Sequence, residues 1–169
     1  QGHAGAVVLT DDSLRRRDIA LVDSRVNREG LELLSPLHYL EKALVESSNL
    51  RFGSLDEVLL AAPDVVILAD IAEMTEASEA ALIEWTNEGG LLVRFAGPRL
   101  AASEVSRSVE HPLLPVRLRA GGRFVGGAMS WGEPKTLAPF EQGSPFFGLT
   151  VSDELRVTAQ VVAQPDPQL

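Results

Sequence analysis

The middle of the chain alternates short apolar runs with segments of helical periodicity. The clearest run, residues 64–70, has the unbroken apolar centre Val-Val-Ile-Leu-Ala. A run without polar alternation is typical of a strand buried on both faces of a sheet. Residues 19–23 and 91–96 have the same aliphatic character, and residues 50–52 form a shorter candidate. The pattern therefore predicts four strands, with 64–70 as a central parallel strand.

Helix signals separate these strands. Ser35 is suited to an N-cap and Pro36 to the first helical position, so a helix is expected over residues 36–45. Ser54 and Glu57 have the spacing of a capping box, and the helix that they open should stop at Pro63.

A third helix is expected to begin after Thr75 and to end at the Gly-Gly pair 89–90. Its predicted apolar stripe consists of Ala77, Ala81, Leu82 and Trp85.

The β-α alternation predicts an α/β fold, a doubly wound and mostly parallel sheet of the flavodoxin-like type. One further run, residues 6–10, is too close to 19–23 for a crossover helix, so an edge or antiparallel strand is expected there. The whole chain, 1–169, is expected to form a single α/β domain with its core at about 6–110.

After about residue 110 the composition shifts to Gly, Pro and alternating residues. Residues 116–119, a Gly-Gly turn at 121–122 and residues 123–131 predict a hairpin, and 155–163 alternates as a half-exposed strand does. A β-rich C-terminal extension is therefore expected over about 111–163.

Composition excludes several classes of function. The 24 acidic and 15 basic side chains give a formal charge of −9, which repels nucleic acid. The absence of cysteine removes disulfides and thiolate metal sites, and the three histidines have no paired-ligand spacing, so neither a metal nor a cofactor is expected. The apolar runs are shorter than the roughly 20 residues of a membrane-spanning helix. The basic run Arg15-Arg16-Arg17 is most simply a solvated turn.

Two segments, 62–70 (APDVVILAD) and 88–97 (EGGLLVRFAG), resemble class I glutamine amidotransferase-like domains. A closer resemblance covers nearly the whole chain and is carried by 26–30 (VNREG), 35–40 (SPLHYL), 95–100 (FAGPRL) and 114–122 (LPVRLRAGG). These segments resemble the soluble region of bacterial membrane proteins that have two N-terminal transmembrane helices of the aerotolerance-operon type and a C-terminal domain of unknown function.

The resemblance implies a piece of a Gram-negative inner-membrane protein and brings no activity with it. The positive-inside tendency would return the soluble part to the periplasm. The implied partners are other proteins of a membrane complex or a small molecule.

Active amidotransferases place a nucleophile on the tight turn between a strand and the next helix. The corresponding residues here, 95–99 (FAGPR), include no Cys, Ser or Thr, and Pro98 removes one amide that an oxyanion hole would use. The sequence therefore predicts a domain without amidotransferase activity.

Open α/β sheets bind ligands at the carboxyl ends of their strands. Asp23 and Asp70 should end two strands, and Arg25, Asn27 and Arg99 follow strand ends closely, so these five residues form the candidate ligand-binding site. The plainer interpretation is that the aspartates cap turns or helix starts and pair with the arginines.

Three functions stay open from the sequence. The first is a non-catalytic ligand-sensing or protein-interaction domain, with a possible apolar patch around Trp131, Phe146 and Phe147. The second is a small-molecule-binding or hydrolytic enzyme that uses Asp23 and Asp70. The third is an architectural spacer.

Overall fold

The computed structural model describes residues 15–23, 37–107, 111–126 and 132–164. The chain divides into two compact units. The first unit spans Gln1–Ala69 and Met74–Phe95, and the second spans Asp70–Glu73 and Ala96–Leu169. That the whole chain forms one domain stays a prediction, as does the strand at 6–10, which lies outside the described residues.

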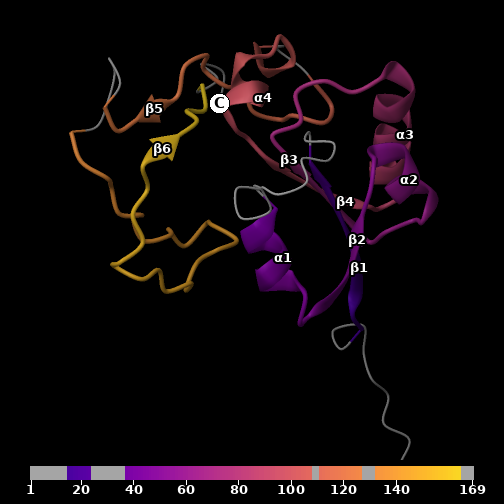
Figure 1. The fold of residues 1–169 in the computed structure, drawn as a ribbon, viewed down its shortest axis with the longest axis horizontal. Helices are drawn as coiled ribbons and strands as arrows, with labels where there is room; N and C mark the ends of the chain where they lie inside the picture. Colours follow the sequence, from indigo (N-terminus) through magenta and orange to yellow (C-terminus); the bar gives the residue numbers. More distant parts are fainter. Residues whose placement is uncertain (1–14, 24–36, 108–110, 127–131, 165–169) are drawn as a thin grey trace, which may run out of the picture. The chain divides into compact units, whose positions relative to one another are not determined.

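The first unit contains a four-stranded sheet in which all pairs are parallel. Its strands are β1 (Arg17–Asp23), β2 (Ser48–Phe52), β3 (Val65–Ala69) and β4 (Leu91–Phe95), in the order β2-β1-β3-β4 (Figure 1). β3 pairs with β1 on one side and with β4 on the other, and four of its five residues are buried. The predicted central parallel strand is confirmed.

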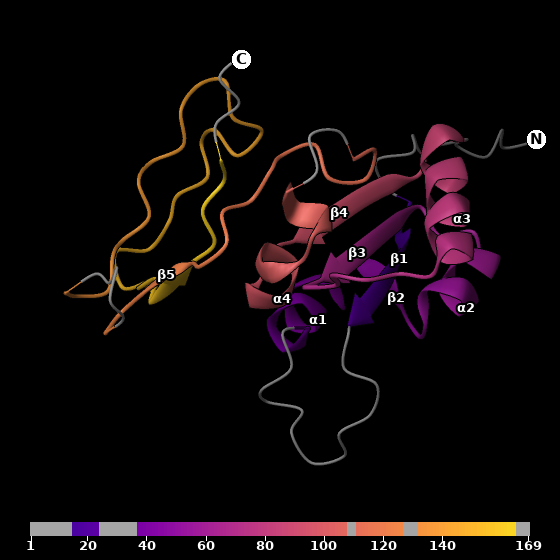
Figure 2. The same ribbon diagram turned by 90° about the horizontal axis from the view of Figure 1, so that it is seen from above.

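Helices lie on both sides of this sheet, with α1 (His38–Leu44) on one side and α2 (Leu55–Leu60) and α3 (Glu76–Asn87) on the other (Figure 2). Leu40 and Leu44 of α1 pack on a cluster that includes Ile19, Leu21 and Ile67. The chain steps from β1 to β2 in one direction and from β2 through β3 to β4 in the other, so right-handed crossovers place the helices on opposite faces. This arrangement is consistent with the predicted doubly wound α/β fold.

The predicted N-caps of α2 and α3 are confirmed. The Ser54 hydroxyl accepts from the backbone N–H of Glu57, and the Glu57 carboxylate accepts from the backbone N–H of Ser54 at 2.9 Å. The Thr75 hydroxyl accepts from the backbone N–H of Ser78 at 3.1 Å. Both helices therefore begin at the residues that the sequence indicates.

The predicted apolar stripe of α3 is confirmed at Leu82 and is wrong at Ala77 and Ala81. Ala77 and Ala81 are exposed, whereas Ser78 and Leu82 are buried and Trp85 is half-buried. The Ser78 hydroxyl donates to the Asp56 carboxylate of α2 at 2.6 Å. This bond gives a polar residue a satisfied place on the buried face, which a count of apolar positions does not anticipate.

The arginine run is exposed, as predicted, but Arg17 begins β1 and Arg16 makes defined contacts. The Arg16 guanidinium donates to the carbonyl oxygens of Val45 and Glu46, both at 2.9 Å, and to that of Ser48 at 3.3 Å. A cation with several donors stabilises the carbonyls that a helix C-terminus leaves unpaired. Arg16 therefore joins the beginning of β1 to the end of α1.

The second unit contains the short helix α4 (Pro98–Ala102), a 3-10 turn (Val105–Arg107) and two antiparallel strands of two residues each, β5 (Arg123–Phe124) and β6 (Ala159–Gln160). Its small core consists of Leu100, Ala101 and Leu118, with Leu114 and Val161 packed against them.

The predicted hairpin between 116–119 and 123–131 is wrong where its residues are described. Phe124 pairs with Ala159, and Leu118 forms a bridge with Ala163, so both segments pair with the C-terminal part of the chain. A Cβ on Gly122 would lie 2.6 Å from the carbonyl oxygen of Gln160. The glycine pair thus permits close approach of a third segment instead of closing a two-residue turn.

Candidate functional site

Only three of the five candidate ligand-binding residues lie in the part of the chain that the structure describes. Arg25 and Asn27 lie outside the described residues, so their place in a binding site stays a prediction. Asp23 ends β1 in the first unit, is half-buried and stands in register with Ala69 of β3. Asp70 follows β3 directly and belongs, with Arg99, to the second unit.

The carboxylate of Asp70 holds the beginning of α4. Its Oδ1 accepts from the backbone N–H of Leu100 at 2.9 Å, and its Oδ2 accepts from the backbone N–H of Arg99 at 3.2 Å. The N-cap of α4 is Gly97, which has no side chain to accept these bonds, and Pro98 at the first position has no N–H. Asp70 therefore caps the helix from a distant part of the sequence.

The structure brings Asp70 and Arg99 together through the backbone of Arg99. This is the capping role that the plainer interpretation assigns to Asp70. The main chain of Asp70 has φ +53°, a left-handed conformation that aspartate adopts more readily than most residues.

Gly97 is needed for this contact. A Cβ at position 97 would lie 2.4 Å from Cγ of Asp70, closer than two non-bonded carbons approach. The Asp70 carboxylate therefore fills the space that a side chain at position 97 would occupy.

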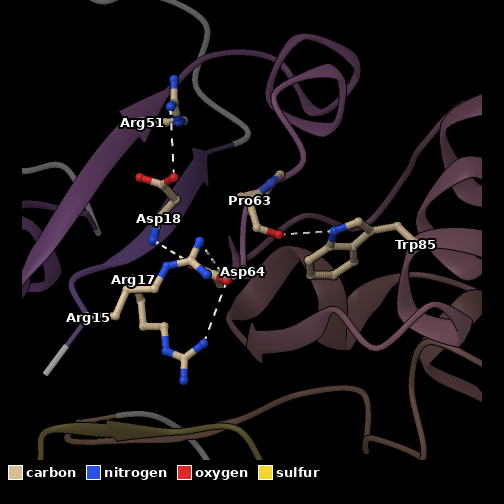
Figure 3. A network of polar contacts seen from close by, with 7 residues as sticks. All are labelled: Arg15, Arg17, Asp18, Arg51, Pro63, Asp64 and Trp85. Carbon is tan, nitrogen blue, oxygen red and sulfur yellow. Dashed lines mark hydrogen bonds and ion pairs between the residues drawn. The ribbon is translucent and has the colours of Figure 1, made fainter. Parts of the chain in front are cut away.

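A second polar cluster lies at the amino ends of β1 and β3 (Figure 3). Asp64 Oδ2 accepts from the backbone N–H of Asp18 at 2.9 Å. Asp64 Oδ1 lies 3.9 Å from Nη2 of Arg15 and 3.7 Å from Nη1 of Arg17. On the far side of β1, Arg51 reaches Asp18 at 4.0 Å.

These contacts lower the pKa of Asp64 below its ordinary value of 3.8. The backbone hydrogen bond from Asp18 is the largest cause, desolvation opposes it, and the positive charges of Arg15 and Arg17 add to the lowering. Asp64 is consequently an ionised anchor that binds the start of β1 to the start of β3.

Sequence reasoning missed this cluster. The available signal was the spacing of Arg15 and Arg17. In an extended chain, two residues that are two positions apart point to the same side, and here both arginines point toward Asp64, which precedes the neighbouring strand β3. The solvated turn predicted for the arginine run gives these side chains no partner.

Beside this cluster the first unit has a pocket of about 580 Å³. It is formed by the start of β1, the connection from α2 to β3 and the connection from α3 to β4. The lining residues are Arg17, Ala62, Pro63, Asp64, Val65, Trp85, Glu88, Gly89, Gly90 and Leu91. The volume falls within the range of small-molecule sites.

Trp85 is fixed in one wall of this pocket by two contacts. Its indole Nε1–H donates to the carbonyl oxygen of Pro63 at 3.1 Å, as Figure 3 shows. The backbone of Gly90 packs so closely on the ring that a Cβ there would lie 2.2 Å from Cε2 of Trp85. The indole is therefore a rigid part of the pocket.

Among the described residues, no three His, Cys, Asp or Glu side chains are grouped so as to hold a metal ion. Within the same residues, no helix has the length and apolar character needed to cross a membrane. Comparison of the chain with protein-family models, curated proteins and solved structures gave no match.

Proposed function

We propose that the chain is a non-catalytic protein-interaction module with a flavodoxin-like core and a β-rich C-terminal extension. The strand order β2-β1-β3-β4 supports the core assignment, since it corresponds to the first four strands of the order 2-1-3-4-5. The pairing of β5 with β6 and the bridge between Lys135 and Val157 support the extension.

The observation that carries the interaction function is an exposed apolar turn in the second unit. Phe146, Phe147 and Leu149 are 57%, 58% and 60% exposed. Exposed aromatic residues that are adjacent on a surface are typical of protein-binding patches. The third residue of the predicted patch, Trp131, lies outside the described residues.

This turn is an ordered feature of the backbone. The N–H of Phe147 donates to the carbonyl oxygen of Ser144 at 3.0 Å, and the N–H of Phe146 donates to the Ser144 hydroxyl at 3.1 Å. The ring of Phe140 lies against that of Phe146, with centroids 5.3 Å apart. The backbone of the turn is thus fixed by local bonds, which reduces the entropy lost when a partner binds.

Asp70 and Gly97 argue against the alternative of a hydrolytic enzyme. Both oxygens of the Asp70 carboxylate accept from amides of α4, and Gly97 has no room for a nucleophile. A general base needs a lone pair directed at the substrate, and this carboxylate is directed at the helix.

Site-specific photo-crosslinking tests the interaction function. A photoreactive phenylalanine analogue at position 147, introduced into the chain in its natural host, should give a discrete crosslinked product. The same analogue at Glu154, which is exposed in the same unit, should give none. The double variant Phe146→Ser and Phe147→Ser should retain the fold and lose function in the host. Equal crosslinking at both positions, or at neither, would refute the proposal.

A thermal-shift screen tests the ligand-binding alternative at the carboxyl ends of the strands. Sugars, amino acids, nucleotides and divalent ions are compared on the natural chain and on the Arg99→Ala variant. A specific ligand at 100 times its dissociation constant adds about 2.7 kcal/mol of stability. A shift that Arg99→Ala abolishes would favour that alternative over the interaction function.

We further propose that the parent protein is anchored in a bacterial inner membrane and that this chain faces the periplasm. The support is the resemblance described above. This chain has no cysteine of its own, so a single Cys introduced at exposed Glu133 is the probe, and the parent protein without that Cys is the control. A membrane-impermeant maleimide should label it in intact spheroplasts. Labelling only after lysis would place the chain in the cytoplasm.

A further inference from the structure

The pocket at the amino ends of β1, β3 and β4 has charged walls of opposite sign. Arg17 stands at the start of β1, and Glu88 stands in the connection that leads into β4. Because β3 lies between β1 and β4, and neighbouring strands are about 4.8 Å apart, the backbones of β1 and β4 are about 10 Å apart.

The cationic wall has unused donors. Arg17 and Arg15 share one oxygen of Asp64 at 3.7 and 3.9 Å, longer than a hydrogen bond, while the other oxygen accepts from Asp18. One carboxylate between two guanidiniums leaves one positive charge. The side chain of Arg17 is 47% exposed, so its planar donors are accessible to a carboxylate.

The anionic wall is formed by Glu88 and the C-terminal end of α3. Glu88 is the C-cap of α3, where the helix dipole is negative, and neither α3 nor α2 has a basic residue in its last turn. Within the described residues, the Glu88 carboxylate has no hydrogen bond or ion pair. A bound ammonium group would relieve this concentration of negative charge.

An apolar surface separates the two walls. Trp85, Pro63 and Leu91 line the pocket, and the indole is held rigidly. A rigid aromatic ring between two opposite charges suits a small molecule with an apolar body and two charged ends.

We propose that this pocket binds a zwitterion of dipeptide size, whose ammonium and carboxylate ends are separated by two residues of extended chain of about 3.3–3.6 Å each. Its carboxylate lies on Arg17, its ammonium near Glu88 and its apolar part on Trp85. A ligand with a single charge would be attracted by one wall and repelled by the other. The proposal concerns the first unit and is independent of the interaction surface on the second.

A ligand series on the complete chain tests the pocket. The chain has two tryptophans, so Trp131→Phe leaves Trp85 as the reporter of fluorescence. The probes are glycyl-leucine and alanyl-leucine, which carry both charges, N-acetylglycyl-leucine, which lacks the ammonium, and glycyl-leucinamide, which lacks the carboxylate. At least one zwitterion should cause a saturable change, and both blocked compounds should bind at least about tenfold more weakly.

Variants assign the two ends of the ligand. Arg17→Gln should remove the preference for glycyl-leucine over glycyl-leucinamide, and Glu88→Gln should remove the preference for glycyl-leucine over N-acetylglycyl-leucine. The control Glu84→Gln, on the exposed side of α3, should bind as the natural chain does. The proposal is overturned by the absence of a saturable change with either zwitterion at about 10 mM, or by equal binding of the blocked compounds. This comparison uses the natural residues at 17 and 88, so it decides the matter even if a variant misfolds.

Discussion

The carboxylate of Asp70 and the backbone N–H of Leu100 are joined by a 2.9 Å hydrogen bond that spans 30 positions of sequence. The segment that leaves the central strand is thereby bonded to the beginning of α4. The second unit depends on this contact, because its core starts at Leu100 and Ala101.

Replacement of Asp70 by alanine should destabilise the protein by about 1–2 kcal/mol, the usual cost of losing a helix cap. Asp70→Asn should cost less, since asparagine accepts the same bonds and tolerates the φ of +53°. Urea denaturation measures the change, and hydrogen exchange at Arg99 and Leu100 locates it. Equal stability of the alanine and asparagine variants would contradict the capping role.

Replacement of Gly90 by alanine should destabilise the first unit by about 1–3 kcal/mol, because the added methyl group collides with the ring of Trp85. The fluorescence of Trp85 should change with it. Gly132→Ala is the matched control, since nothing lies within 4 Å of the new Cβ at that position. An unchanged free energy of unfolding in Gly90→Ala would show that the indole is free to move.

Replacement of Arg16 by glutamine should cost about 1 kcal/mol, because the carbonyls of Val45 and Glu46 lose a charged donor and are left to solvent. Amide exchange in the last turn of α1 should accelerate. Lys42→Gln serves as the control, because Lys42 is exposed on the same helix and its side chain makes no hydrogen bond to the described backbone. Equal exchange rates in the two variants would refute a role for Arg16 at the helix end.

Asp64 should make stability depend on acid pH. Its pKa in the folded chain lies below the ordinary value of 3.8, so its contribution is complete above that value and is lost as the pH falls through the folded-state pKa. The stability difference between the natural chain and Asp64→Asn should therefore shrink as the pH falls below about 4. A difference that is constant over this range would contradict the ionised anchor. Asp153→Asn, at an exposed position, provides the control.

The sheet of the first unit could be predicted because local signals and burial agree there. Residues 64–70 have no polar residue at their centre, and β3 is the strand that pairs on both sides. Ser54 and Thr75 carry their capping function in the residue type itself, so the starts of α2 and α3 could be assigned within one residue.

Contacts between distant segments could not be predicted in the same way. Arg16 donates to carbonyls about 30 positions away, and Ser78 is buried because Asp56 of another helix accepts its hydroxyl. In the second unit, the turn at Gly121 suggested a hairpin, but Gly122 instead approaches Gln160. Each of these contacts depends on which segments are adjacent in space. The periodicity of a single segment does not tell which other segment lies next to it.

The dependence of Gly97 on Asp70 also limits how this chain could acquire new chemistry. A serine or cysteine introduced at position 97 would collide with the carboxylate, and a smaller residue at position 70 would leave α4 without its cap. Each single change is harmful before the other is present. Loss of the Asp70 carboxylate costs about 1–2 kcal/mol, whereas a side chain at position 97 has no room while the carboxylate remains, so a change at position 70 has to come before or together with a nucleophile at position 97.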